Sequence, residues 1–281
     1  MFNGCKNLVN APTLPAIEPA GGCYSSMFYG CSKLNNITCL MIPSSGFSSW
    51  MYGVSASGTF TKDPNAVTWS RDSNGIPTGW TVNEVQDIPV DYSKRYFTIK
   101  SLADNNTITF SNGELYVSTD EGATWTNLNG TLATLNTGDE LWIRGSYYND
   151  TTPTSCFSST GDFEVSGNLY SLVTTAFLSS SPYLGSYRFC KLFYNCTHLK
   201  NASNLVFKKT SSDYSHVYDS MFMGCTGLVD ASFTLADDRP HQYGYSHMFS
   251  GCTSLVSPPI LDFNTIGQYG CEYMFQGCTS L

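Results

Sequence analysis

The sequence predicts a mainly β protein with short helical turns, built as a solenoid in two partial arrays with a small antiparallel β-sandwich domain between them. Three observations lead to this fold class. An octapeptide with the pattern M-F-x-G-C-x-x-L recurs six times in two blocks. A short, largely apolar segment follows five of the copies. Between the blocks, apolar residues alternate with polar ones, which is typical of half-buried strands.

The repeated octapeptide is the strongest signal in the chain. Its copies are MFNGCKNL (1–8), MFYGCSKL (27–34), LFYNCTHL (192–199), MFMGCTGL (221–228), MFSGCTSL (248–255) and MFQGCTSL (274–281). Successive copies begin 26, 165, 29, 27 and 26 residues apart. A period of 26 to 29 residues lies in the range of leucine-rich repeats, so each array is predicted to be a leucine-rich-repeat solenoid.

Each repeat can be divided into a turn and a strand. An aromatic residue or cysteine lies three positions before the Met in five copies, and with the Met-Phe pair it predicts one turn of a short helix. A residue suited to the left-handed conformation follows and is expected to end that turn. These residues are Gly30, Asn195, Gly224, Gly251 and Gly277. The segments after the motif (8–14, 34–40, 199–205, 228–234 and 255–261) predict short strands that pair in one parallel ladder.

The eleven cysteines are predicted to be reduced packing residues. Six of them occupy the same position of the repeat, so stacking would place them in a column about 4.8 Å apart. Parallel side chains of this kind rarely form disulfides. The chain has no C-x-x-C pair and no histidine at zinc-ligand spacing, so we expect no metal site and no cofactor.

The domain organisation follows from these patterns. Residues 1–57 are the C-terminal part of a first array, and 58–82 form its end cap, with Trp69 and Trp80 covering the last repeat. Residues 83–91 are a linker, and 92–150 form the small β-sandwich domain. Residues 151–281 are the second array, truncated, with an N-terminal cap at 163–173. Five strands are predicted in the sandwich, at 96–102, 106–111, 114–119, 124–128 and 140–146.

One motif in the middle domain is similar to the Asp-box of sialidase-type propellers. Residues 118–125, S-T-D-E-G-A-T-W, match its S-x-D-x-G-x-x-W pattern. The resemblance implies a structural role, in which the Asp120 carboxylate ties a hairpin turn and Trp125 packs beneath it. The motif occurs once and no two arginines are close in sequence, so it does not predict sialidase chemistry.

Composition and motifs argue against several functions. The net charge of −8 disfavours nucleic acid and anionic membranes, and no apolar run is long enough for a membrane span. No G-x-S-x-G sequence, glycine-rich phosphate loop or nucleophile–base pair is recognisable. His198 and His247 are expected at surface or groove positions, and Asp237 with Asp238 in a solvated loop. The sequence therefore predicts no enzyme and assigns no catalytic, cofactor-binding or metal-ligating residue.

Binding is the favoured role, because repeat solenoids expose variable positions on an extended surface. The variable positions are Lys6, Asn7, Lys33, Thr38, Lys200, Asn201, Asp230, Ser232 and Ser257. Tyrosines at the fixed position before the Met are predicted to be core residues: Tyr24, Tyr218 and Tyr245. These patterns do not single out binding residues.

The MFxGCTSL repeat with its following strand resembles the BspA-like leucine-rich-repeat proteins of bacterial surfaces. The resemblance covers about 1–60 and 163–281, and the middle module is similar to β domains interleaved with such arrays. It implies a non-catalytic surface or secreted protein that adheres to an extracellular host protein or glycan. The repeats here are longer than the commonest ones of that family, and the inserted domain is a further departure, so the ligand stays open.

Three possibilities remain. The chain is either a bacterial surface protein or a receptor-binding and structural component of a phage virion, such as a tail fibre. A third possibility is an accessory region of a carbohydrate-active enzyme whose catalysis lies elsewhere. Because Met1 aligns with the repeat Met and Leu281 closes a motif, the sequence is expected to be a fragment of a longer chain. Its anchor, secretion signal and oligomeric state are therefore undefined.

Overall fold

The computed structural model describes residues 2–16, 22–42, 47–66, 69–72, 74–86, 88–111, 113–127, 133–147, 156–174, 184–207, 214–237 and 240–281. The chain divides into two compact units. Unit 1 is Met1–Asp91 with Glu121–Ala123, and unit 2 is Tyr92–Asp120 with Thr124–Leu281. Within the described residues, helix is confined to two short 3-10 turns, η1 (Tyr92–Lys94) and η2 (Leu169–Leu172), and no helix could cross a membrane. The protein is therefore mainly β, with a β-solenoid-like arrangement.

Unit 1 contains a parallel sheet in the order β1-β2-β3. Its strands are β1 (Asn36–Cys39), β2 (Gly58–Lys62) and β3 (Trp80–Glu84). Two parallel bridges, from Asn10 to Asn36 and from Leu14 to Cys39, add part of the preceding repeat to the same ladder. The segment predicted as an end cap, 58–82, therefore contributes β2 and the start of β3 to the ladder. Trp69 is buried and stacks on Trp50 at 5.5 Å.

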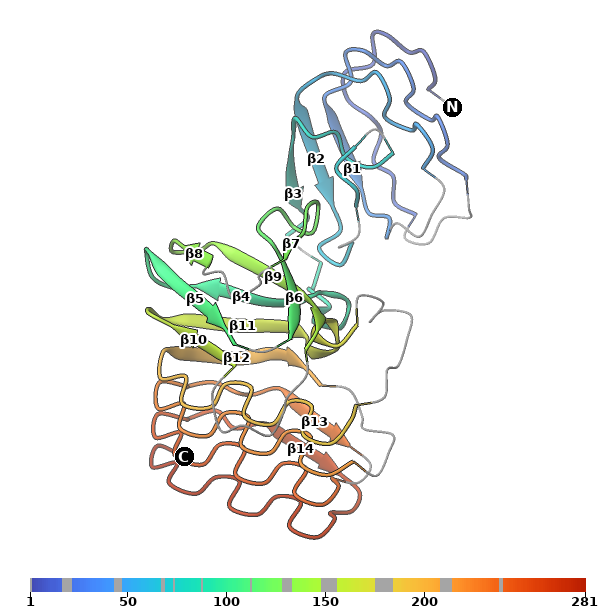
Figure 1. Cartoon of the computed structure of the whole chain (residues 1–281). Coiled ribbons are helices and arrows are strands. Elements are labelled where there is room, and N and C mark those ends of the chain that lie inside the picture. Colours follow the sequence, from blue (N-terminus) through green and yellow to red (C-terminus); the bar gives the residue numbers. More distant parts are fainter. Residues whose placement is uncertain are drawn as a thin grey trace. The chain divides into compact units, whose positions relative to one another are not determined.

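Unit 2 contains three sheets among its described residues. The six-stranded sheet has the order β12-β11-β4-β9-β6-β7, the three-stranded sheet β10-β5-β8, and β13 pairs with β14 (Figure 1). The strands are β4 (Phe97–Ser101), β5 (Asn106–Phe110), β6 (Glu114–Ser118), β7 (Thr126–Asn127), β8 (Ala133–Leu135), β9 (Glu140–Ser146), β10 (Phe157–Ser159), β11 (Phe163–Asn168), β12 (Leu199–Val206), β13 (Thr234–Asp237) and β14 (Ile260–Phe263).

The five strands predicted in the middle of the chain are confirmed as β4, β5, β6, β7 and β9. Two strands of the three-stranded sheet, β8 and β10, were not predicted. Both are three residues long, too short for an alternating pattern to be recognised.

Strand β11 connects two kinds of pairing in one sheet. It is antiparallel to β4, with Phe163 opposite Ser101, and parallel to β12, with Phe163 opposite Leu199. The antiparallel strands after Tyr92 and the first strand of the second array are therefore hydrogen-bonded into one sheet. This explains why they form one compact unit, although the sequence divides them at residue 150. The segment 163–173, predicted as a cap, is β11 followed by η2.

The predicted parallel ladder of the repeats is confirmed, with a shift along the chain in the last two coils. Bridges join Asn201 to Asp230 and Asp230 to Ser257, and β13 then pairs with β14 three to four residues further on. The ladder is interrupted opposite Pro258 and Pro259. Proline has no N–H to donate, so those two positions cannot continue it.

The predicted helical turn around the Met-Phe pair is wrong. These residues belong instead to runs of consecutive turns, at 22–30, 48–53, 186–195, 217–224, 242–251 and 268–277, which we call the turn runs. In Figure 1 the last of them follow one another as parallel, meandering layers, coloured orange to red.

The hydrogen bonding of the turn runs explains why they replace helix. Alternate N–H groups bond within the run, as from Leu192 to the carbonyl of Phe189 three residues earlier. The intervening N–H groups bond to the next coil, as from Phe189 to Val217 and from Phe193 to Met221. Both sets of backbone donors are thus satisfied, and half of them bind one coil to its neighbour.

A positive φ recurs at every fourth residue of the turn runs, with His216, directly before the run at 217–224, counted with that run. The residues of the second array concerned are Tyr187, Lys191, Asn195, His216, Ser220, Gly224, Tyr243, His247, Gly251, Tyr269, Tyr273 and Gly277. The left-handed conformation predicted for Gly30, Gly224, Gly251, Gly277 and Asn195 is confirmed, with φ between 59° and 77°. The tyrosine, lysine and histidine positions were not predicted, because such side chains seldom adopt a positive φ.

The core of the second array is built from columns of stacked aromatic rings. Phe193, Phe222 and Phe249 stack with ring centroids 5.3 Å apart, and Phe275 follows at 5.5 Å. Tyr218 and Tyr245 form a neighbouring column at the same spacing and are almost fully buried, as predicted. Equivalent positions of successive coils therefore meet face to face, and each coil buries the apolar surface of the next.

All eleven cysteines are free thiols in the structure, and seven of them are buried, but Cys5 and Cys23 are exposed rather than packed as predicted. The repeat cysteines donate their S–H groups to the Phe carbonyl oxygen of the preceding coil. The pairs are Cys31–Phe2, Cys196–Phe157, Cys225–Phe193, Cys252–Phe222 and Cys278–Phe249, at 2.7 to 3.1 Å, with Phe157 standing in for a repeat Phe in the second pair. Burial raises the pKa of the Cys252 thiol to about 12 and that of Cys271 to about 11.

Thiol reagents should therefore distinguish two classes of cysteine. We expect Cys5 and Cys23, the two exposed thiols, to react rapidly with Ellman's reagent in the folded protein, because a reactive thiol must be accessible and able to ionise. In denaturant without reductant, all eleven should react. A Cys5→Ser/Cys23→Ser variant should lose the rapid phase alone. Fewer than eleven thiols in denaturant would contradict the column of free cysteines.

The Asp-box turn has the structural role that its resemblance implies. The Asp120 carboxylate accepts hydrogen bonds from the Ser118 hydroxyl at 2.7 Å and from the Thr124 N–H at 2.9 Å and hydroxyl at 2.7 Å. Trp125 packs edge-on against Tyr96 at 4.9 Å, and the guanidinium of Arg144 lies 4.0 Å from the centre of the Trp125 ring.

The turn should make stability depend on pH. Desolvation acts to raise the pKa of Asp120, but the hydrogen bonds from Thr124 and Ser118 outweigh it and lower this pKa below the ordinary 3.8. A lowered folded-state pKa stabilises the protein above the unfolded value, and this contribution is lost as the pH falls through the folded value. We expect Asp120→Asn to destabilise unit 2 at neutral pH, with the difference vanishing in acid, as followed by urea unfolding. A difference that did not change with pH would contradict this assignment.

Candidate functional site

The candidate site is a polar groove on one face of the six-stranded sheet. Its side chains form two rows, the first across strands β12, β11, β4 and β9 and the second across β12, β11 and β4. The rows lie in the part of the sheet where the second array and the antiparallel strands meet. Pairing places Asn201, Glu164, Lys100 and Glu140 opposite one another in the first row. The second row, two residues along β11 and β4, has Asn204, Ser166 and Thr98.

Alternation along the strands explains why this face is polar. In β4, Thr98 and Lys100 lie on the groove side, whereas Phe97 and Ile99, which alternate with them along the strand, are fully buried. In β11, Glu164 and Ser166 line the groove, and Val165 between them is 2% exposed. The apolar alternate residues therefore anchor the strands in the core, and the polar ones form a surface on the other side.

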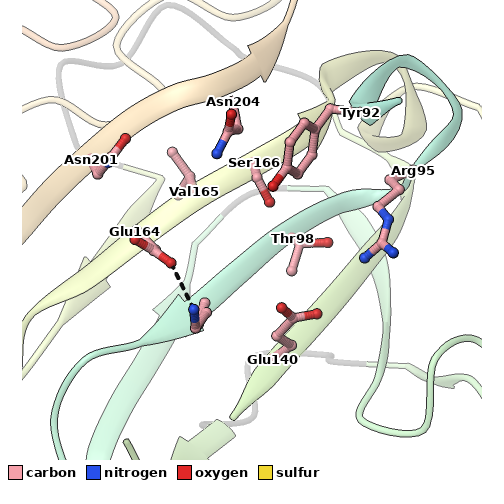
Figure 2. Close-up of a pocket in the computed structure, with 10 residues that line it drawn as sticks. Tyr92, Arg95, Thr98, Glu140, Glu164, Val165, Ser166, Asn201 and Asn204 are labelled. Atoms are coloured by element: carbon pink, nitrogen blue, oxygen red, sulfur yellow. Dashed lines mark ion pairs between the residues drawn. The ribbon is translucent and has the colours of Figure 1, made fainter. Parts of the chain in front are cut away.

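Figure 2 shows the groove with Tyr92 and Arg95 beyond the second row. Both belong to η1 or the residue after it, so the short helical turn closes this end. The groove is open to solvent. At a strand spacing of about 4.8 Å, a row of four residues spans about 14 Å, enough for an extended ligand rather than a single ion.

The charges of the groove balance one another. Lys100 lies between two carboxylates, with its Nζ 3.1 Å from Glu164 Oε1. The hydrogen bond to Glu164 and the charges of Glu164 and Glu140 raise the pKa of Lys100 against the opposing effect of desolvation. Arg95 supplies a second positive charge. Two cations and two anions leave the groove without net charge.

The uncharged side chains offer both donors and acceptors. The Oδ1 of Asn201 accepts from the N–H and hydroxyl of Ser203 at 2.8 and 2.7 Å, so its amide N–H₂ is the group it can offer. The Thr98 hydroxyl donates to the carbonyl of Tyr96 at 3.0 Å, and its oxygen can still accept. Asn204, Ser166 and Tyr92 each bring an amide or hydroxyl that can do both.

The histidines do not join this groove. His198 is 45% exposed, as predicted, and its Nδ1 lies 3.0 Å from Asp162 Oδ1. That hydrogen bond, with Lys200 nearby, lowers the pKa of Asp162. His216 stacks between Tyr187 and Tyr243 at 4.6 and 4.7 Å.

His247 is half-buried, with Nδ1 2.7 Å from the hydroxyl of Ser246. The prediction of a solvated loop for Asp237 is wrong. Asp237 ends β13, is 3% exposed and accepts from the Tyr245 hydroxyl at 3.3 Å. Asp238 lies outside the described residues. Within those residues, no group of three or more His, Cys, Asp or Glu side chains could hold a metal ion.

Sequence reasoning anticipated one residue of the groove. Asn201 was among the variable, exposed positions of the second array, whereas Lys100, Glu140 and Glu164 were not singled out. Each of these three is a polar residue within a predicted strand or cap. Such a residue indicates an exposed face, but it does not indicate which other residues lie on the same face. Their meeting depends on strand order and register, which a single sequence does not give.

Comparisons of the chain with protein-family models, with curated proteins and with solved structures found no match. The groove itself is therefore the basis on which function is argued.

Proposed function

We propose that this chain is a non-catalytic recognition protein, displayed on a cell surface or secreted, that binds an extracellular protein or glycan. The observation that carries the proposal is the groove across β12, β11, β4 and β9. It presents amide, hydroxyl and charged groups on an open face, held by four strands whose other face is packed in the core. Rigid support of this kind suits binding, because little order has to be gained when the ligand arrives.

The chemistry of the groove favours binding over catalysis. A glycoside hydrolase needs two carboxyl groups, one as an acid and the other as a base or nucleophile. Here Lys100 lies between Glu140 and Glu164 and engages Glu164 in an ion pair at 3.1 Å. The carboxylate that would have to gain or lose a proton is thus held by a permanent cation.

The repeats support assignment to the BspA-like leucine-rich-repeat proteins. Six copies of one motif, stacked coils and a column of repeat cysteines fit such an array. The antiparallel strands fit an interleaved β module of sandwich type, since Phe97 of β4 in one sheet packs against Phe157 of β10 in the other at 5.6 Å.

The test is a binding screen of the whole chain by surface plasmon resonance over immobilised extracellular-matrix proteins and glycans. We expect saturable binding to at least one surface, and no binding by the heat-unfolded chain. Recovered glycans should be unchanged in length. Absence of binding to every surface, or shortening of a bound glycan, would refute the proposal.

A further inference from the structure

We infer that the groove on the six-stranded sheet binds a neutral oligosaccharide, laid across the strands along the two polar rows. The inference rests on the proposed recognition role and names the ligand class of that same site. It follows from three properties of the groove: its balanced charge, its mixture of donors and acceptors, and the pairing on both sides of β11 and β4, the strands at its centre.

Pairing of the strands argues against a peptide ligand. A peptide that binds a sheet by adding a strand needs a free edge with unpaired backbone groups. The groove lies over β11, paired on both sides by β12 and β4, and over β4, paired on both sides by β11 and β9. A ligand bound in the groove must be recognised by side chains of the protein, so the hydrogen bonds must be made by polar groups on the surface of the ligand.

The charge pattern argues against an ionic ligand. An anionic polymer would meet the Glu140 and Glu164 carboxylates, and a cation would meet Lys100 and Arg95. Because like charges that lie close together repel, either ligand would lose part of the binding free energy that its attractive contacts provide. A neutral ligand leaves the ion pair between Lys100 and Glu164 intact.

The polar groups fit sugar hydroxyls. A hydroxyl donates one hydrogen bond and accepts others, so it can pair with carboxylates, amides, ammonium and hydroxyl groups alike. The first row offers an amide, a carboxylate, an ammonium and a second carboxylate, and the second row an amide and two hydroxyls. Tyr92, at the closed end in Figure 2, adds an aromatic ring whose face can pack against the C–H face of a sugar ring. A span of about 14 Å accommodates several linked sugars.

The experiment is calorimetric titration of the whole chain with neutral oligosaccharides (maltohexaose, cellohexaose, xylohexaose and mannohexaose) and, as anionic probes, oligogalacturonate and heparin hexasaccharide. We expect binding of at least one neutral probe, with an affinity that does not change from low to high salt. An Asn201→Ala/Asn204→Ala variant should bind that probe about tenfold more weakly or worse, through loss of amide hydrogen bonds.

Two further variants separate loss of contacts from loss of fold. Thr134→Ala, on an exposed position of β8 in the other sheet, should bind as the parent does. Glu140→Gln keeps the size of the side chain and should weaken binding of the neutral probe, while its thermal unfolding stays that of the parent. Unchanged affinity in both groove variants would overturn the inference, as would salt-sensitive binding of the anionic probes alone.

The outcome also separates this inference from the proposed function. Binding to a matrix protein without binding to any saccharide probe would overturn the neutral-sugar assignment and leave the recognition role standing. No binding to proteins or to saccharides would overturn both.

Discussion

Replacing Phe222 with alanine is expected to lower the free energy of unfolding of unit 2 by about 3–5 kcal/mol, the usual cost of removing a buried aromatic ring. Phe222 is fully buried and stacks on Phe193 and Phe249, both at 5.3 Å. Its loss would leave a cavity in the middle of the column that neither neighbouring ring can fill without leaving its own coil. Urea unfolding, followed by circular dichroism, measures the change.

The matched control is Phe275→Ala, at the same position of a later repeat. Phe275 is half-buried and stacks on Phe249 at 5.5 Å. Its replacement should cost about half as much, since part of the ring already contacts water. Equal losses in the free energy of unfolding at the two positions would contradict the view that each Phe stabilises the protein by stacking between neighbouring coils.

Replacing Gly167 with alanine should be still more damaging. Gly167 lies in β11 with φ of +85°, and a Cβ there would overlap the carbonyl oxygen of Tyr96 and lie 2.8 Å from its carbon. Both obstacles are backbone atoms of the neighbouring chain segment, so no side chain can move aside. Since β11 connects β4 to β12, the substitution should separate the two pairings and leave unit 2 poorly folded.

Gly138→Ala separates steric overlap from backbone strain. Gly138 has φ of +91°, and a Cβ at this position would meet no atom within 4 Å, so alanine there should cost only about 1–2 kcal/mol. The loss of cooperative thermal unfolding in Gly167→Ala, against a modest shift in Gly138→Ala, is the expected result. Similar small shifts in both would show that β11 can move away from Tyr96.

The fold was predictable where the local structure depends on residues that are neighbours in sequence. The alternation in 96–102 and 140–146 gave β4 and β9, and the glycine of each motif gave the left-handed turn. The turn runs were not predictable in this way. Tyr218, Met221, Phe222 and Cys225 have the spacing of one helix face, but here that spacing comes from turns that repeat every four residues.

The candidate site was less predictable, because it depends on pairing between distant strands. Lys100 meets Glu164 across 64 positions of sequence, through an antiparallel register that no local pattern encodes. Asn201 joins them only because β12 is parallel to β11 in the same sheet. A polar alternate position indicates an exposed side chain, but which exposed side chains become neighbours is decided by topology.

The alternating donors of the turn runs also constrain how repeats of this kind can change in length. Within each of the last four runs, eight residues separate the first positive-φ position from the third, although the motifs begin 29, 27 and 26 residues apart. Inserting or deleting one residue inside a run would exchange the N–H groups that bond locally for those that bond to the next coil. Inserting or deleting four residues would add or remove a whole turn and leave every other N–H group with the same kind of partner. Natural variation in repeat length is therefore expected in the segments between the turn runs, where sequence can be gained or lost without breaking the bonds between coils.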